Sequence, residues 1–211
     1  MPLVNTLIQG PSGLLEIALS TPENSPATGL AFICHPHPVH GGTMDNKVVQ
    51  TLAKAFAELG CAVMRFNFRG VGKSEGVFDD GIGETEDAAA ALTYAQDQVA
   101  NAAHIPLIAA GFSFGCFVQS RLLQRSNPTR LVLVGPAVKR FDIETVPNDT
   151  VVIQGEADDV VPLADVLDWA RPQALPVTIF PGAGHFFHGR LTELKSVVQR
   201  NCDDLFAARK I

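Results

Sequence analysis

The chain has 211 residues, of which 46% are hydrophobic and 18% are charged, and its formal net charge at pH 7 is −6. This length and composition are typical of a folded chain with a substantial core, so we expect a single domain over residues 1–211 and exclude a disordered one. The negative charge argues against nucleic acid or an anionic membrane as a partner, and no apolar run approaches the roughly 18 residues of a membrane-spanning helix.

Short apolar runs alternate with longer segments of helical periodicity along the whole chain. Strands are predicted at 3–9, 13–20, 29–34, 61–68, 105–112, 130–136, 150–155 and 176–180. Helices are predicted at 45–60, 83–100, 114–125, 162–171 and 188–207. We expect residues 10–13, Gly-Pro-Ser-Gly, to form a hairpin turn, Asp45 to cap the first helix and Gly60 to end it. Such alternation predicts an α/β fold in three layers, with a doubly wound, mostly parallel sheet and an antiparallel hairpin at its N-terminal end.

The glycine-rich segment RGVGKSEG, residues 69–76, contains Gly-Lys-Ser but does not fit a nucleotide-binding motif. A P-loop requires a glycine where this chain has Asn67, and the spacing of Gly70, Gly72 and Gly76 does not match a dinucleotide-binding loop. We interpret the segment as a tight turn that leaves the strand.

The segment AAGFSFGCF, residues 109–117, contains the pattern Gly-x-Ser-x-Gly between an apolar strand and a predicted helix. This is the setting in which a serine lies on a sharp, strained turn with its hydroxyl exposed above the sheet. Gly111 and Gly115 are needed because the two backbones approach closely there. Ser113 is therefore predicted to be a nucleophile, the alternative being a simple N-cap serine.

A nucleophilic serine needs a histidine base, and a carboxylate must orient that base. Downstream of Ser113 the chain has only His185 and His188, and we prefer His185 because it follows the last strand directly. The preceding strand is followed by GEADDVVP, residues 155–162, which offers Glu156, Asp158 and Asp159 as the acid. All three loops open at one edge of a doubly wound sheet, where ligands bind.

The motifs HPHPVHGGTMDNKVV, RFNFRGVGKSEG, GFSFG, GEADDVVP and GAGHFF resemble the α/β-hydrolase superfamily across nearly the whole chain. The resemblance is greatest to small bacterial serine hydrolases that lack a lid and are related to dienelactone hydrolases. It implies that Asp158 is the acid, with Asp159 as the second choice. Dienelactone hydrolases use a cysteine nucleophile where this chain has Ser113, so their substrate does not carry over.

Three histidines, His35, His37 and His40, precede Gly41-Gly42 and resemble the zinc signature of metallo-β-lactamases. Because Val39 stands where that signature has aspartate, we prefer an oxyanion-hole loop to a metal site. One backbone N–H donor is then expected from Phe114 and the other from the loop after the third strand. The superfamily pattern implies that the loop donor is His37, with Gly41 and Gly42 as second choices.

These observations predict a serine hydrolase that cleaves carboxylic esters or related acyl bonds through an acyl-enzyme and uses neither cofactor nor metal. We expect a small-molecule acyl substrate, with His35, His40, Gly41 and Gly42 as candidate residues lining its site. Fourteen residues, 136–149, separate two strands where a lid would enter, and they are too few to build one. Two alternatives remain. One is a catalytically inactive member of this fold that acts as a binding module, and the other is a metallohydrolase that uses His35, His37 and His40.

The cellular location is predicted from the cysteines and the N-terminus. The four cysteines, Cys34, Cys61, Cys116 and Cys202, are scattered and form no Cys-x-x-Cys pair. The first basic residue is Lys47, so a positively charged signal-peptide segment is lacking. We therefore expect a cytoplasmic protein with reduced thiols.

Overall fold

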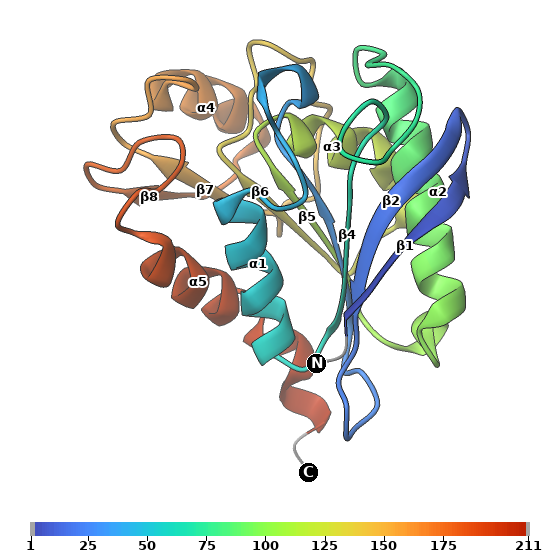
Figure 1. Cartoon of the computed structure of the whole chain (residues 1–211). Helices are drawn as coiled ribbons and strands as arrows, with labels where there is room; N and C mark the ends of the chain where they lie inside the picture. Colours follow the sequence, from blue (N-terminus) through green and yellow to red (C-terminus); the bar gives the residue numbers. More distant parts are fainter. Residues whose placement is uncertain (1–2, 210–211) are drawn as a thin grey trace.

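The computed structural model describes residues 3–209 and shows one eight-stranded sheet between two layers of helices (Figure 1). The strands follow the spatial order β1-β2-β4-β3-β5-β6-β7-β8. Their bounds are β1 Leu3–Gly10, β2 Gly13–Ser20, β3 Leu30–Cys34, β4 Ala62–Phe66, β5 Leu107–Phe112, β6 Arg130–Val134, β7 Val151–Gly155 and β8 Val177–Phe180. The order reverses between β3 and β5, and this switch point is where a doubly wound sheet opens a crevice for a ligand.

The N-terminal hairpin is antiparallel, as predicted, with Gly10 opposite Gly13 across the turn. Strand β2 also pairs antiparallel with β4, whereas the six strands from β4 to β8 are mutually parallel. The mostly parallel α/β fold is therefore confirmed. Every residue of β3 is buried, because helices cover both faces of the central strands.

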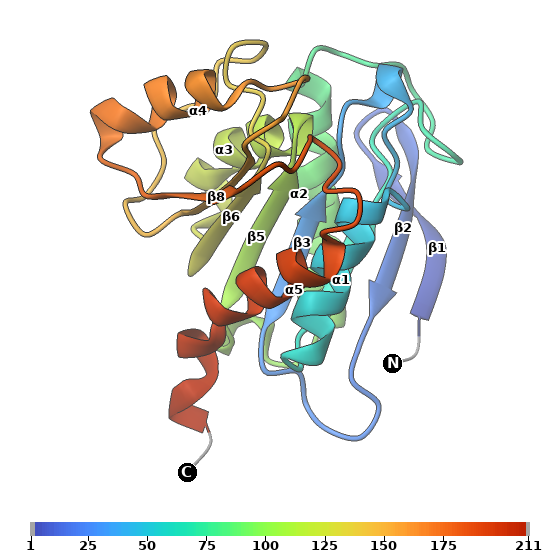
Figure 2. The ribbon, with the colours of Figure 1, turned by 90° about the vertical axis from the view of Figure 1, so that its left-hand side faces the viewer.

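Helices α1 (Lys47–Glu58) and α5 (Leu191–Arg200) cover one face of the sheet. Helices α2 (Ile82–Gln98), α3 (Phe114–Ser126) and α4 (Leu163–Ala170) cover the other, as Figure 2 shows from the side. Alternate strand residues face opposite layers, so Phe32 of β3 packs with the α2 and α3 layer while Ile33 packs with α1 and α5.

The predicted start of the first helix and both predicted ends of the last helix were wrong. Asn46, not Asp45, caps α1: its Oδ1 accepts a hydrogen bond of 2.9 Å from the N–H of Val48. The last helix does not span 188–207. Gly189 has a positive φ of 73°, so α5 begins only at Leu191, and after Arg200 the chain passes into a separate 3₁₀ helix over Asp203–Arg209.

The glycine-rich segment after β4 forms a tight turn, as the sequence indicated. Gly70, Gly72 and Gly76 all have positive φ angles, of 73°, 58° and 90°. The buried Arg69 fixes the turn to α2 through paired hydrogen bonds to Asp87, of 2.9 and 2.7 Å. The segment therefore shapes the loop that leaves β4.

The connection between β6 and β7 contains no helix, so no helical lid is inserted there. It lies against α4, where Trp169 Nε1 donates to the carbonyl of Ile143 at 3.2 Å. Within residues 3–209, no helix is long and apolar enough to cross a membrane.

Candidate active site

Ser113 lies between β5 and α3 in a backbone conformation that few residues other than glycine adopt. Its φ is 55° and its ψ is −116°. Such a conformation costs on the order of 1–3 kcal/mol and persists only where the surrounding structure enforces it. Here the N–H of Ser113 donates to Val134 of β6, and its carbonyl accepts from Cys116 of α3.

The two glycines that flank Ser113 allow the strand, the helix and a neighbouring loop to meet. A Cβ atom at Gly111 would lie 2.5 Å from the carbonyl oxygen of Gly115. One at Gly115 would lie 2.3 Å from the carbonyl oxygen of Cys34. Backbone atoms cannot move aside as a flexible side chain would, so both positions require glycine.

His185 and Asp158 form a buried pair at the ends of β8 and β7. Nδ1 of His185 donates to Oδ2 of Asp158 at 2.7 Å, which leaves Nε2 as the second ring nitrogen. Only 3% of His185 is exposed, and its ring packs against Phe112 and Phe186. Gly135 makes room for it, since a Cβ there would lie 3.1 Å from the ring.

The carboxylate of Asp158 receives hydrogen bonds on both oxygens. Oδ1 accepts from the N–H groups of Val160 and Val161 at 2.9 and 2.7 Å, and Oδ2 also accepts from Nε2 of Gln154 at 3.0 Å. Burial acts to raise the pKa of the Asp158 carboxyl, but the hydrogen bonds from His185, Val161 and Val160 outweigh it and hold that pKa below its ordinary value. The carboxylate is thus kept ionised beside the imidazole. Asp159 is exposed and makes no such contact with His185.

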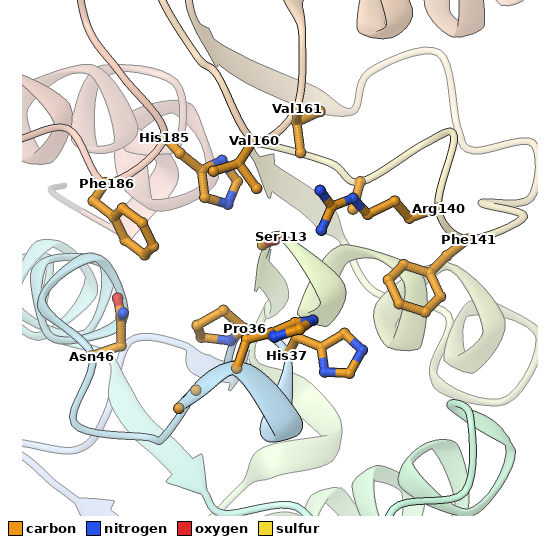
Figure 3. A pocket seen from close by; sticks show the side chains of 14 residues that line it. Pro36, His37, Asn46, Ser113, Arg140, Phe141, Val160, Val161, His185 and Phe186 are labelled. Carbon is orange, nitrogen blue, oxygen red and sulfur yellow. The ribbon is translucent and has the colours of Figure 1, made fainter.

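Ser113 and His185 line the same cavity, which has a volume of about 320 Å³. In Figure 3, His185 and Phe186 lie to one side of Ser113, Arg140 and Phe141 to the other, and His37 lies below it. The cavity is lined by Pro36, His37, His40, Gly41, Gly42, Asn46, Ser113, Ala137, Arg140, Phe141, Val160, Val161, His185 and Phe186. The separate loops that follow β3, β5, β6, β7 and β8 thus meet at one site.

The backbone N–H groups of Phe114 and His37 have no acceptor within residues 3–209. Phe114 is the first residue of α3, where the helix dipole favours negative charge. By contrast, Gly41 donates its N–H to Pro38, and Gly42 donates its N–H to His37. Those two bonds fold the loop into a short turn and occupy the N–H groups of Gly41 and Gly42.

His35 does not line the cavity, so that expectation was wrong. The side chain is fully buried, its Nδ1 donates to the carbonyl of Pro36 at 2.6 Å, and its Nε2 accepts from the N–H of Phe68 at 3.0 Å. Burial lowers the pKa of His35 to about 3, although the bond to Pro36 acts in the opposite direction. His35 is therefore a neutral residue that ties the β3 loop to the segment after β4.

The three histidines do not converge as metal ligands would. Both ring nitrogens of His35 are already used, and within residues 3–209 no three His, Cys, Asp or Glu side chains are placed to hold a metal ion together. His37 and His40 pack ring to ring at 4.6 Å, and Nδ1 of His37 accepts from the N–H of Val39. This arrangement favours loop shaping over the metallohydrolase alternative.

Sequence reasoning missed several residues of this site, three of them polar. Gln154 supports Asp158, and it was detectable as the one polar residue in the buried strand VVIQG. Asn46 reaches the cavity through its role as the helix cap, and Arg140 does so from an irregular connection. No periodic pattern marks a residue of an irregular loop as part of a site.

Comparisons with known proteins agree with the fold and place the chain in a family. Residues 37–148 match the family described as Serine aminopeptidase, S33, a range that includes Ser113 but neither Asp158 nor His185. An α/β serine hydrolase homologue from Coxiella burnetii is 41% identical, with a TM-score of 0.86 over 95% of this chain and 98% of that one. An α/β serine hydrolase without a lid from Xanthomonas campestris is 36% identical, with a TM-score of 0.89 over 97% and 96%.

An uncharacterized protein of Rickettsia prowazekii is also similar, with 34% identity over 205 residues that cover 90% of this chain and 84% of the relative. The family match spans just over half of the chain, and the two solved structures cover nearly all of it. The chain therefore belongs to the Serine aminopeptidase S33 family of α/β serine hydrolases.

Proposed function

We propose that this protein hydrolyses carboxylic esters or related acyl bonds through a covalent acyl-enzyme on Ser113. The observation that carries the proposal is the placement of Ser113, on its strained turn, in one cavity with the buried His185–Asp158 pair. A serine hydroxyl is a weak nucleophile until a base takes its proton, and this pair supplies an oriented base.

In the first half of the reaction, Ser113 Oγ attacks the carbonyl carbon while His185 Nε2 takes the hydroxyl proton. The charge that develops on the carbonyl oxygen is stabilised by the N–H groups of Phe114 and His37, each contributing roughly 3–4 kcal/mol to lowering the barrier. Asp158 stabilises the imidazolium that forms. His185 then gives its proton to the leaving group, and the acyl group stays on Ser113.

In the second half, a water molecule attacks the acyl-enzyme and His185 takes a proton from it. Collapse of the tetrahedral intermediate returns that proton to Ser113 and releases the carboxylic acid. Every proton is carried by His185, so this cycle requires neither a metal nor a cofactor.

The residues of the cavity do not favour an aminopeptidase, although the matching family carries that description. A free amino terminus is a cation and needs a carboxylate or carbonyl partner inside the site. None of the residues lining the cavity is acidic, and the one that always carries a charge is Arg140. Uncharged or anionic acyl substrates fit this wall better.

The proposal is tested with 4-nitrophenyl esters of increasing acyl length and with the variant Ser113→Ala. We expect measurable turnover by the wild type and a loss on the order of a millionfold in the variant. Circular dichroism serves as the control for folding. Near-wild-type turnover by a folded Ser113→Ala variant would refute the proposal.

A further inference from the structure

Arg140 gives the cavity wall a positive charge that no acidic residue of the wall balances. The other polar side chains of the wall are histidines, Ser113 and Asn46. A cation on a cavity wall that carries no carboxylate attracts an anion into the cavity.

The backbone turn at Arg140 places this residue beside the cavity. The N–H groups of Arg140 and Phe141 both donate to the carbonyl of Ala137 at 3.1 Å, and this forms a turn at the start of the β6–β7 connection. In Figure 3 the guanidinium extends from that turn toward the centre of the cavity, on the side of Ser113 away from Phe186.

The guanidinium of Arg140 has no ion-pair partner within residues 3–209. Its neighbour Lys139 is paired with Asp165 at 2.6 Å. Arg140 also borders a second hollow that Asp159 lines, but no carboxylate of the described residues lies within ion-pair distance of the guanidinium. Its hydrogen-bond donors are therefore available to a ligand.

The field of Arg140 also reaches His37. Burial is the main cause that lowers the pKa of His37, followed by the nearby His40 and by Arg140, while Asp80 opposes them. Because His37 is held neutral, Arg140 supplies the fixed positive charge on this side of Ser113.

We propose that Arg140 is a specificity-determining residue that binds an acidic group on the acyl part of the substrate. The preferred substrates are then acyl compounds that carry a carboxylate in addition to the scissile carbonyl, such as half-esters of dicarboxylic acids. The acyl part is assigned because His185 must reach the leaving group, which places that group on the opposite side of Ser113. This inference rests on the proposed function.

The planar guanidinium suits a carboxylate, since its N–H groups match both oxygens. The side chain is exposed at the rim, so the interaction is screened by salt and is weaker than a buried pair. We expect a preference of about tenfold in kcat/KM, which corresponds to about 1.4 kcal/mol.

The test compares two substrates of the same shape, the 4-nitrophenyl half-ester of adipic acid and its methyl ester, 4-nitrophenyl methyl adipate. The wild type should favour the half-ester about tenfold, and 0.5 M salt should reduce that preference. Arg140→Gln should remove most of it, and Arg140→Lys should retain part of it. Lys139→Gln is the matched control and should keep the wild-type ratio, because Lys139 does not line the cavity.

A second substrate pair moves the charge to the leaving group: 4-acetoxybenzoate and its methyl ester. The wild type should not favour the charged member, and a preference here that Arg140→Gln removes would overturn the acyl-side assignment. An equal loss of kcat/KM for both adipate esters in Arg140→Gln would also overturn the acyl-side assignment. The guanidinium would then stabilise the oxyanion and not the carboxylate. If the wild type hydrolyses none of the four esters, the proposed function itself fails.

Discussion

The buried His35 should make the protein less stable as the pH falls from 7 to 5. Burial holds the pKa of His35 at about 3, against an ordinary value of 6.5. The unfolded chain therefore binds a proton at this site more readily than the folded protein does. The stability that comes from keeping His35 neutral is fully present above about pH 6.5. It is lost progressively as the pH falls toward 3.

The size of the effect follows from the two pKa values. Each unit of pH inside this window costs at most about 1.4 kcal/mol, and the loss from His35 between pH 7 and pH 5 is about 2 kcal/mol. The assay is urea unfolding at pH 7, 6 and 5 of the wild type and of His35→Asn, which cannot titrate there. The variant should be less stable at pH 7, because it loses the hydrogen bonds to Pro36 and Phe68.

The stability difference between wild type and His35→Asn should therefore shrink by about 2 kcal/mol between pH 7 and pH 5. The matched control is His188→Asn, which makes the same substitution at an exposed histidine. Parallel curves for the wild type and His35→Asn would refute the reasoning, because they would mean that His35 protonates equally well in the folded state.

Three further predictions concern the site and its scaffold. Gly115→Ala should lower stability in urea by about 3 kcal/mol or more, because its Cβ would meet a backbone carbonyl at 2.3 Å, whereas Gly184→Ala, with its nearest contact at 3.7 Å, should be tolerated. Asp158→Asn should reduce kcat on the order of 10⁴-fold and Asp159→Asn far less; the reverse ranking would move the acid by one residue. His37→Ala should cost about tenfold or less in kcat and His37→Pro, which deletes the N–H, about a hundredfold or more; equal severe losses would give the imidazole a direct role.

The fold was predictable because its signals are local. Strand–helix alternation gave the element types, and the Gly-Pro-Ser-Gly turn gave the hairpin. The helix ends were less predictable, because Asn46 and Asp45 are both good caps and only the tertiary contacts choose between them. Asp45 instead pairs with Arg65 at 3.1 Å.

The residues that the strand ends bring together could be predicted for the same reason. Ser113, Asp158 and His185 each follow a predicted strand, and parallel strands place such residues at one edge. The buried position of His35 could not be predicted, because one of its two hydrogen-bond partners is Phe68, which is 33 residues away. Arg140 was missed because its position depends on how an irregular connection packs against α4.

The central claim, that Ser113 is the activated nucleophile, is tested most directly by a fluorophosphonate probe followed by peptide mass mapping. We predict stoichiometric labelling at Ser113, no labelling in Ser113→Ala, and strongly slowed labelling in His185→Ala, because the hydroxyl then lacks its base. Heat-unfolded protein is the control for nonspecific reaction. An unlabelled but folded wild type, or a label on another residue, would contradict the account.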